Sequence, residues 1–393
     1  MRPLLALAAA GLAAGCVAFP AGSSGAAAPI PIGSTGPLTG RSASADVLRG
    51  ERAYLRYVNA RGGVNGRPIE LELLDDGGDA ARAAANARRL IERDQVFALF
   101  SIVGSEASLA VRDVAAAAHV PQVFSMATAR SLGSSSYPGT TGYPPSSYEV
   151  AEIFAQHVLA TDRTTAKIGV LYANDDDGQD ALAGLKQGLG AQGARLLVAA
   201  APIGPTATDV SSELRQLQGA GANTLELFVP AKLVLATYPE LALLGWQPQV
   251  YVGPDVTGTP FPRLTTSPAA EGSISVLWAR DPATARFAHD PGAKLAAQVM
   301  AHYGSGPSSG AVVAGMAAAY SLVDALRQAG PSPTRTSLLS AIASLNEVSN
   351  PFLVPGAQVR LAPGRRFPLT QLLLLRRLGG RWVPFGGIQS AAT

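Results

Sequence analysis

The sequence predicts an α/β protein with two doubly wound parallel-sheet lobes. Its 393 residues suit two domains of ordinary size, and 47% hydrophobic against 15% charged residues indicates a folded chain. Short apolar runs alternate with longer segments of helical periodicity, which is typical of parallel strands connected by helices. This alternation occurs twice, on either side of a Gly-, Ser- and Pro-rich segment at 131–148.

The first series of elements extends from residue 30 to residue 126. We expect strands at the apolar runs 30–34, 67–76, 96–103 and 120–126, and helices at 45–63, 79–95 and 105–119. The run that begins at Val96 stops at Gly104-Ser105, where the pattern becomes helical. Ser105 is therefore placed to cap the third helix.

The second series follows the Gly-, Ser- and Pro-rich segment. We expect helices at 148–160, 178–193, 210–222 and 232–245, and strands at 166–175, 195–203, 223–229, 249–255 and 273–279. The last part of the chain departs from this alternation. It predicts a helix of small residues at 310–330 and a hairpin at 370–386 that turns at Gly379-Gly380.

The N-terminus is typical of an export signal, with one Arg, an apolar run too short to span a bilayer, and then small residues. Cys16, the sole cysteine, follows Ala13-Ala14-Gly15 and resembles a bacterial lipobox, although a larger aliphatic residue is usual in place of Ala13. The alternative is cleavage near Ala28. Residues 1–28 are then signal and linker, and we expect an exported protein in the periplasm or on the outer face of the cytoplasmic membrane. No later segment is expected to be long and apolar enough to span a membrane.

Composition and motifs argue against nucleic-acid binding and catalysis. The net charge is only +3, and the arginines are scattered. The four histidines lack metal-ligand spacing, no G-x-S-x-G elbow occurs, and "GSTGPLTG" matches neither a P-loop nor a dinucleotide motif. We therefore expect no enzyme activity, cofactor or metal. The acidic run Asn174–Asp177 could bind a divalent cation, but a capped turn before a helix is the favoured interpretation.

A ligand site is expected where strands of the two sheets end. Ligands of open parallel sheets bind beyond the carboxyl ends of the strands, so the loops at 33–40, 104–108, 125–131, 174–178 and 253–257 should line a cleft. Ser105 and Thr128 follow neighbouring strands and add two hydroxyls to the free amides of a helix start. This arrangement suits a carboxylate. The alternative for Ser105 is a helix cap and nothing more.

Several segments resemble the leucine/isoleucine/valine-binding type of extracytoplasmic substrate-binding proteins of ABC importers, namely "GSTGPLTG", "AYLRYVNARGGVNGRPIELELLDDG", "GVLYANDDDG" and "LGWQPQVYVGPD". The resemblance implies a type I periplasmic binding fold with a three-stranded hinge. It places one lobe at 29–145 plus about 280–352, and the other at about 146–279 plus 353–393. It also implies a monomer whose partners are the ABC permease and ATPase subunits.

By matching position, the resemblance implies that Ser105 and Thr128, with backbone groups near Met126 and Ala127, hold a carboxylate of the ligand. Asp255 falls where amino-acid-binding members place an acid against an ammonium group, although an Asp after Gly-Pro also orders turns. We therefore expect a small polar organic ligand that bears a carboxylate. The alternative is a ligand-sensing or envelope-interaction lipoprotein with the same fold.

The positions around an aliphatic ligand side chain depart from the family pattern. Where aromatic rings are common, this chain carries Arg41 or Ser42, Asp177 and Ala311. A wider, more polar pocket argues against leucine, isoleucine or valine as the ligand. Arg41 could meet a second anionic group or be solvated. Tyr148, and Tyr143 beside it, could supply a stacking face or pack in the core.

Overall fold

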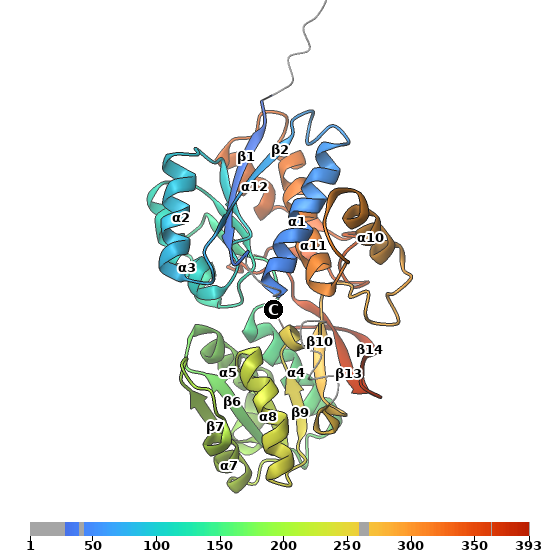
Figure 1. The fold of residues 1–393 in the computed structure, drawn as a ribbon. Coiled ribbons are helices and arrows are strands. Elements are labelled where there is room, and N and C mark those ends of the chain that lie inside the picture. The colour runs from blue at the N-terminus through green and yellow to red at the C-terminus, as the bar shows by residue number, and fades with distance from the viewer. Residues whose placement is uncertain (1–27, 39–42, 259–266, 363, 393) are drawn as a thin grey trace, which may run out of the picture.

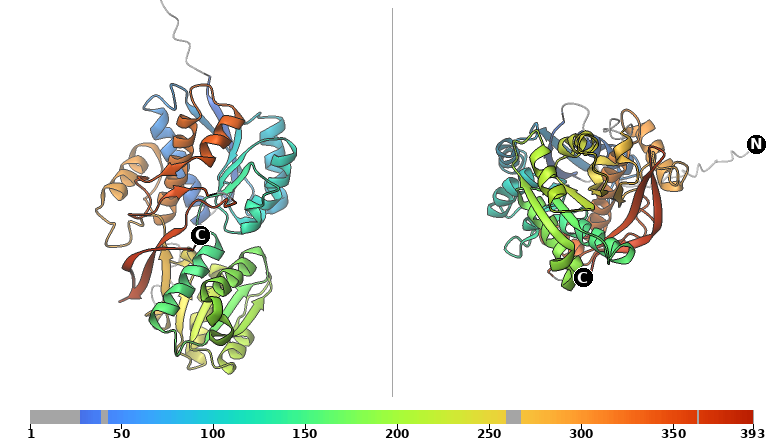
Figure 2. Two further views of the ribbon diagram at one scale, coloured as in Figure 1. Left: turned by 180° about the vertical axis from the view of Figure 1, so that it is seen from behind. Right: turned by 90° about the horizontal axis from the view of Figure 1, so that it is seen from below.

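The computed structural model describes residues 28–38, 43–258, 267–362 and 364–392. It has two lobes, each built on its own sheet, and the lobes lie one above the other in Figure 1. The C-terminal end of the chain lies at the junction between the two lobes. Figure 2 shows the same two lobes from two further directions.

Lobe 1 contains a five-stranded parallel sheet in the order β2-β1-β3-β4-β5. Successive side chains of a strand face opposite sides of a sheet. Accordingly, Ile32 of β1 packs in one core cluster with Tyr54, and Leu99 of β3 packs in another with Leu90 and Val111, so helices cover both faces. The elements are β1 (Ile30–Gly36), β2 (Ile69–Asp75), β3 (Ala98–Phe100), β4 (Gln122–Ser125), β5 (Thr140–Gly142), α1 (Ala43–Asn59), α2 (Ala80–Glu92) and α3 (Ser105–Ala117).

Lobe 2 contains a seven-stranded sheet in the order β14-β13-β10-β9-β8-β6-β7. Strands β6 to β10 are parallel, whereas β13 and β14 are antiparallel to their neighbours and form the predicted C-terminal hairpin. The strands are β6 (Ile168–Ala173), β7 (Leu197–Ile203), β8 (Thr224–Phe228), β9 (Gln249–Val252), β10 (Ile274–Leu277), β13 (Gln371–Leu378) and β14 (Arg381–Ser390). The helices are α4 (Ser147–Thr161), α5 (Asp176–Leu189), α6 (Gly193–Leu196), α7 (Ser211–Gly219) and α8 (Ala231–Leu243).

The chain passes between the lobes three times: after β5, after β10 and before β13. Between the second and third passages lie α10 (Pro291–Tyr303), α11 (Gly310–Gln328), α12 (Arg335–Ala343) and the short paired strands β11 (Asn346–Glu347) and β12 (Val359–Arg360). Helices α10 and α11 pack beside α1 in lobe 1, and α12 packs against α11 (Figure 1). Three such connections agree with the hinge that the resemblance implies.

Several of these elements are absent from the sequence prediction. β5 lies inside the segment taken as a loop, because three residues are too few to show a periodicity. α10 and α12 are also missed. The start of α10 carries a local signal, since the Asp290 side chain accepts a hydrogen bond from the Ala293 N–H and Pro291 occupies the first turn.

The helix α11 corrects one expectation about membranes. By length and composition it could cross a membrane, whereas no segment after the signal was expected to be long and apolar enough to do so. In the fold, most of α11 is buried, including Val312, Met316, Leu322 and Leu326. Its apolar composition is therefore explained by its place in the core of lobe 1.

Replacing Gly315 with alanine is expected to destabilise lobe 1. A Cβ at Gly315 of α11 would lie 2.0 Å from the backbone oxygen of Val47 in α1, so the two helices would have to separate. Overpacking of this kind costs about 1–3 kcal/mol. Thermal unfolding should show a midpoint several degrees lower. Gly219→Ala in α7 is the control, because no atom lies within 4 Å of its added Cβ. Equal midpoints for the two variants would contradict the predicted close approach.

Candidate functional site

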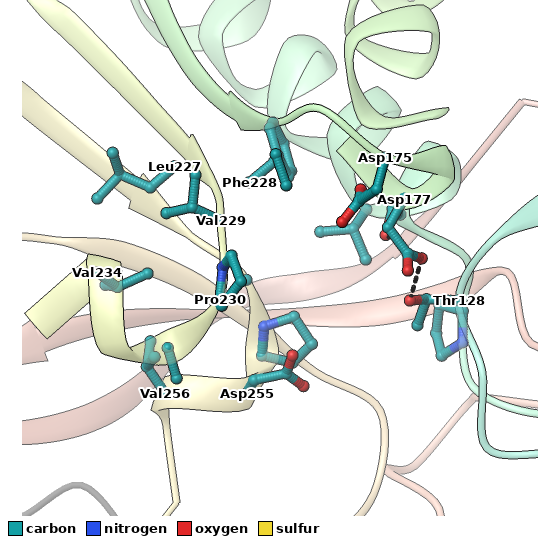
Figure 3. A pocket seen from close by; sticks show the side chains of 17 residues that line it. Thr128, Asp175, Asp177, Leu227, Phe228, Val229, Pro230, Val234, Asp255 and Val256 are labelled. Atoms are coloured by element: carbon teal, nitrogen blue, oxygen red, sulfur yellow. Dashed lines mark hydrogen bonds between the residues drawn. The ribbon is translucent and has the colours of Figure 1, made fainter. Parts of the chain in front are cut away.

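A pocket of about 230 Å³ lies where the two lobes meet, beyond the carboxyl ends of β6, β8 and β9 (Figure 3). Lobe 2 contributes most of its lining. Thr128, from the loop after β4 of lobe 1, reaches the same space, as do Pro145 and Ser147 at the first passage between the lobes. This is the position at which open parallel sheets bind ligands.

One side of the pocket is apolar. β8 ends at Phe228, and the chain turns at Pro230 into α8, so the end of the strand and the first turn of the helix face the pocket together. The short turn after β9 adds Val256. The apolar lining residues are Leu227, Phe228, Val229, Pro230, Val234 and Val256. This side suits hydrocarbon or an aromatic ring.

The pocket also carries three carboxylates: Asp175 and Asp177 lie opposite the apolar side, and Asp255 lies beside Val256 in the turn after β9. The Asp175 side chain accepts a hydrogen bond from the Gly178 N–H at 2.9 Å and caps α5, as the favoured interpretation of the acidic run predicts. Asp255 has no hydrogen-bond or ion-pair partner among the described residues.

Ser105 occupies a different place in its helix from the one predicted. The N-cap of α3 is Gly104, which has a φ of 94°, and Ser105 is the first helical residue. The prediction that Ser105 caps the helix is therefore wrong. Its Oγ instead accepts hydrogen bonds from the N–H of Thr128 at 3.1 Å and of Ala129 at 3.2 Å. Ser105 thus fixes the segment that presents Thr128 to the pocket.

Asp177 connects the two lobes. The Thr128 hydroxyl donates to Asp177 Oδ1 at 2.5 Å, and the Ser147 hydroxyl lies 3.4 Å from the same oxygen (Figure 3). Burial raises the pKa of the Asp177 carboxyl, and the side chains of Thr128 and Ser105 oppose that shift. A carboxylate of the protein therefore lies on the Thr128 hydroxyl, one of the two that were expected to receive a carboxylate of the ligand.

Residues 29–370 match the family described as periplasmic binding protein. The chain belongs to this family. Among curated relatives, Leu/Ile/Val-binding protein homolog 7 of Brucella abortus is 27% identical over 223 residues, which are 54% of this chain and 55% of that protein. The amino acid binding protein of Pseudomonas aeruginosa is 34% identical over 94 residues, 23% of this chain and 25% of that protein. The chain thus matches about half the length of the first relative and a quarter of the second.

Solved structures show the same type I periplasmic binding fold. A branched chain amino acid ABC transporter protein of Thermus thermophilus with bound valine has a TM-score of 0.78 at 18% identity, covering 93% of this chain and 97% of its own. A solute binding protein of an ABC transporter from Rhodopseudomonas palustris, in complex with 3,4-dihydroxy benzoic acid, has a TM-score of 0.73 at 19% identity, covering 93% and 98%. At these identities the likeness concerns the fold.

Two further predicted site residues of this periplasmic binding protein do not line the pocket. The Met126 N–H donates to the Ile102 carbonyl at 2.9 Å, and the Met126 carbonyl accepts from the Gly104 N–H at 3.0 Å, so both backbone groups are used between neighbouring strand ends. Ala127 is buried against Leu132 and Phe367. Neither residue has a free backbone group shown facing the pocket.

The predicted aromatic residues also lie elsewhere. The Tyr148 ring stacks on the Arg130 guanidinium at 3.9 Å and borders a second cavity, which is lined partly by residues near the C-terminus. Tyr143 is fully buried, and its hydroxyl lies 3.0 Å from Ser321 Oγ. Ala311 belongs to α11 and does not line the pocket. Cys16, Arg41 and Ser42 lie outside the described residues.

The apolar side of the pocket is what sequence reasoning missed. The loop after the predicted strand 223–229 was not counted among the site loops, although it follows the same carboxyl-end rule as the others. That rule alone could have found Val229 and Pro230. For metals, no group of three His, Cys, Asp or Glu side chains within the described part of the chain is arranged to hold an ion.

Proposed function

We propose that this periplasmic binding protein is the solute-binding component of an ABC importer and captures a small polar organic solute in the pocket between its lobes. The observation that carries the proposal is the pocket itself, which combines three strand ends of lobe 2 with Thr128 of lobe 1. A solute held there contacts both lobes and so favours their closed arrangement. Relatives and structural neighbours whose names or titles mention amino acids and aromatic acids support a small organic solute.

The three passages of the chain between the lobes supply the hinge in this proposal. With passages near residues 145 and 280 and between β12 and β13, lobe 2 can rotate about these connections without disturbing either sheet. The closed form would be recognised by the permease and its ATPase subunits in the cytoplasmic membrane. We further propose that the chain is a monomer, exported to the periplasm or anchored by lipid at Cys16 on the outer face of that membrane.

The expectation of a carboxylate on the solute meets a competitor in Asp177. The Thr128 hydroxyl donates to this side chain. A carboxylate of the solute reaches that hydroxyl only if Asp177 leaves it. The position of Asp177 therefore bears directly on which class of solute the pocket can accept.

A thermal-shift screen tests the proposed function. A solute that binds only the folded protein raises the unfolding midpoint in proportion to its affinity, so saturating shifts identify ligands. The panel contains amino acids, aromatic acids, dicarboxylates, amides and amines, and hits are confirmed by calorimetry and by recovering the solute unchanged. Conversion of a solute to product, or the absence of any saturable shift, would overturn the proposal.

Ser105→Ala is expected to weaken binding of the solute found in that screen by about tenfold to a hundredfold. The variant leaves the N–H groups of Thr128 and Ala129 without their acceptor, a loss of about 1.5–3 kcal/mol that loosens the loop at the pocket. Calorimetry measures the change in Kd. Ser136→Ala, at an exposed serine in the segment before β5, is the control. An unchanged Kd for Ser105→Ala would remove Ser105 from the site.

A further inference from the structure

Asp177 lies on the Thr128 hydroxyl, one of the two hydroxyls predicted to hold a carboxylate of the solute. We propose that Asp177 determines specificity by excluding solutes that present a carboxylate there, so that the pocket selects a small organic amine with an apolar body. The inference rests on the proposed function and names the class of solute that the same pocket takes. Four observations support it. The Thr128 hydroxyl already donates to Asp177, and α5 is held against the 128–131 segment of lobe 1. The charged side chains that line the pocket are acidic, and one side of the pocket is apolar.

The hydroxyls at this end of the pocket are already used. Each hydroxyl has a single hydrogen to donate. The Thr128 hydroxyl donates its hydrogen to Asp177 Oδ1 at 2.5 Å, and the hydroxyl of Ser147 lies 3.4 Å from the same atom. Ser105 Oγ already accepts two hydrogen bonds from backbone N–H groups. A solute carboxylate would therefore find the Thr128 hydroxyl already used and the Ser147 hydroxyl facing Asp177.

The position of Asp177 is fixed by other contacts of the same helix. Next to it, Asp176 Oδ2 accepts from the Ser131 hydroxyl at 2.5 Å. One turn further on, Asp180 Oδ2 accepts from the Arg130 N–H at 2.5 Å. The first turns of α5 in lobe 2 are thus bound to the 128–131 segment of lobe 1 at three points. The placement of Asp177 is therefore a property of this interface and does not depend on one side-chain rotamer.

The remaining charges of the pocket are negative. Asp175 and Asp255 line it together with Asp177, and no lysine or arginine is among the described residues that line it. Asp255 has no hydrogen-bond or ion-pair partner among the described residues, and its carboxylate faces the open space in Figure 3. A second anion brought to this end is repelled by all three carboxylates, whereas an ammonium group is attracted and can donate hydrogen bonds to Asp255.

The apolar part of the lining determines which hydrocarbon group of the solute the pocket can hold. Leu227, Val229, Val234 and Val256 lie on the side away from Asp175 and Asp177 (Figure 3). A hydrocarbon chain or a single ring gains from contact with these side chains. At about 230 Å³ the pocket holds only a small molecule. These properties describe an aliphatic or aryl-alkyl amine that lacks a carboxylate.

Matched solutes test the inference by calorimetry on the purified protein. One set is 3-methylbutylamine, leucine and 4-methylpentanoate, and the other is 2-phenylethylamine, phenylalanine and 3-phenylpropanoate. Within each set the hydrocarbon group is constant, and only the charged groups differ. We expect the protein to bind one amine at least tenfold more tightly than the amino acid and the carboxylate of its set. Failure of both amines to bind more tightly than their carboxylate counterparts would overturn the inference.

Two variants assign the effect to Asp177. Asp177→Ala frees the hydroxyls, so carboxylate binding should strengthen at least tenfold while amine binding weakens at least tenfold. Asp177→Asn keeps the shape of the side chain but removes its charge, so amine binding should weaken with little gain for the carboxylates. Asp113→Asn, on the exposed face of α3, is the control. Circular dichroism and unfolding midpoints confirm that each variant folds.

The outcomes separate this inference from the proposed function. If the carboxylates or amino acids bind most tightly and Asp177→Ala leaves the order of affinities unchanged, Asp177 does not determine specificity, while solute capture stands. If neither set nor the wider screen yields a saturable ligand, the proposed function fails as well.

Discussion

Replacing Glu226 with glutamine is expected to stabilise the protein strongly at pH 8 and hardly at all near pH 4. Glu226 lies in β8, between its partners Val170 in β6 and Tyr251 in β9, and its side chain is fully buried. Neither carboxyl oxygen has a hydrogen-bond partner within the described residues. Desolvation raises the pKa of Glu226 from its ordinary 4.5 to about 8.

The sign of the effect follows from proton linkage. Between pH 4.5 and 8 the folded state keeps the proton of Glu226, whereas the unfolded state has lost it, so the free energy of unfolding falls as the pH rises. The full penalty, present above pH 8, is on the order of 5 kcal/mol. Glutamine has a similar shape and carries no charge at either pH, so it avoids the penalty.

Urea unfolding at several pH values from 4 to 8 measures this difference. The gap between Glu226→Gln and wild type should widen steadily with pH. Glu92→Gln on the exposed side of α2 serves as the control and should follow the wild type throughout. Parallel curves for wild type and Glu226→Gln would show that Glu226 titrates normally in the folded protein.

Asn350→Ala is expected to destabilise the protein by about 3 kcal/mol, because it breaks a buried polar network. The Asn350 amide donates to Glu347 Oε1 at 2.6 Å and to the Ala317 carbonyl at 3.0 Å. Ser321 donates to the same Glu347 oxygen at 2.9 Å. Burial raises the pKa of Glu347 to about 7 although these hydrogen bonds oppose it, so their loss leaves a buried carboxyl less well satisfied.

The network reaches the first passage between the lobes, because the Tyr143 hydroxyl lies 3.0 Å from Ser321 Oγ. Asn350→Ala should therefore lower the unfolding midpoint and also loosen the hinge, which hydrogen exchange at residues 143–146 would detect as faster exchange. The neighbouring Asn346→Ala removes an exposed amide and is the matched control. A midpoint equal to that of the control would show that the network contributes no stability.

Much of the architecture could be predicted from sequence, because strands and long amphipathic helices carry a clear period. The alternation around Ile30–Gly36 and Ala80–Glu92 is of this kind. Elements without a period, such as the three residues of β5, were lost. The cap of α3 was wrong for a different reason. Ser105 has the chemistry of a cap, but the positive φ of Gly104 moves the helix start by one residue.

The site could be predicted only in part. The carboxyl-end rule brings Thr128, Asp177 and Asp255 to one pocket, and Figure 3 shows them there. The rule says nothing about which side chains hydrogen-bond one another across the lobes. That Thr128 donates to Asp177 depends on how closely α5 approaches the 128–131 segment, and no pattern within either segment records that distance.

The pairing of β10 with β13 governs when the molecule can finish folding. The edge of β10 offers unpaired backbone groups until residues 371–378 are present to cover it. Lobe 1 has a similar requirement, since α1, near the start of the chain, packs against α11. Both lobes thus stay incomplete until nearly the entire polypeptide has been synthesised. Contacts so distant in sequence form slowly, so the native state is reached late and by both halves together.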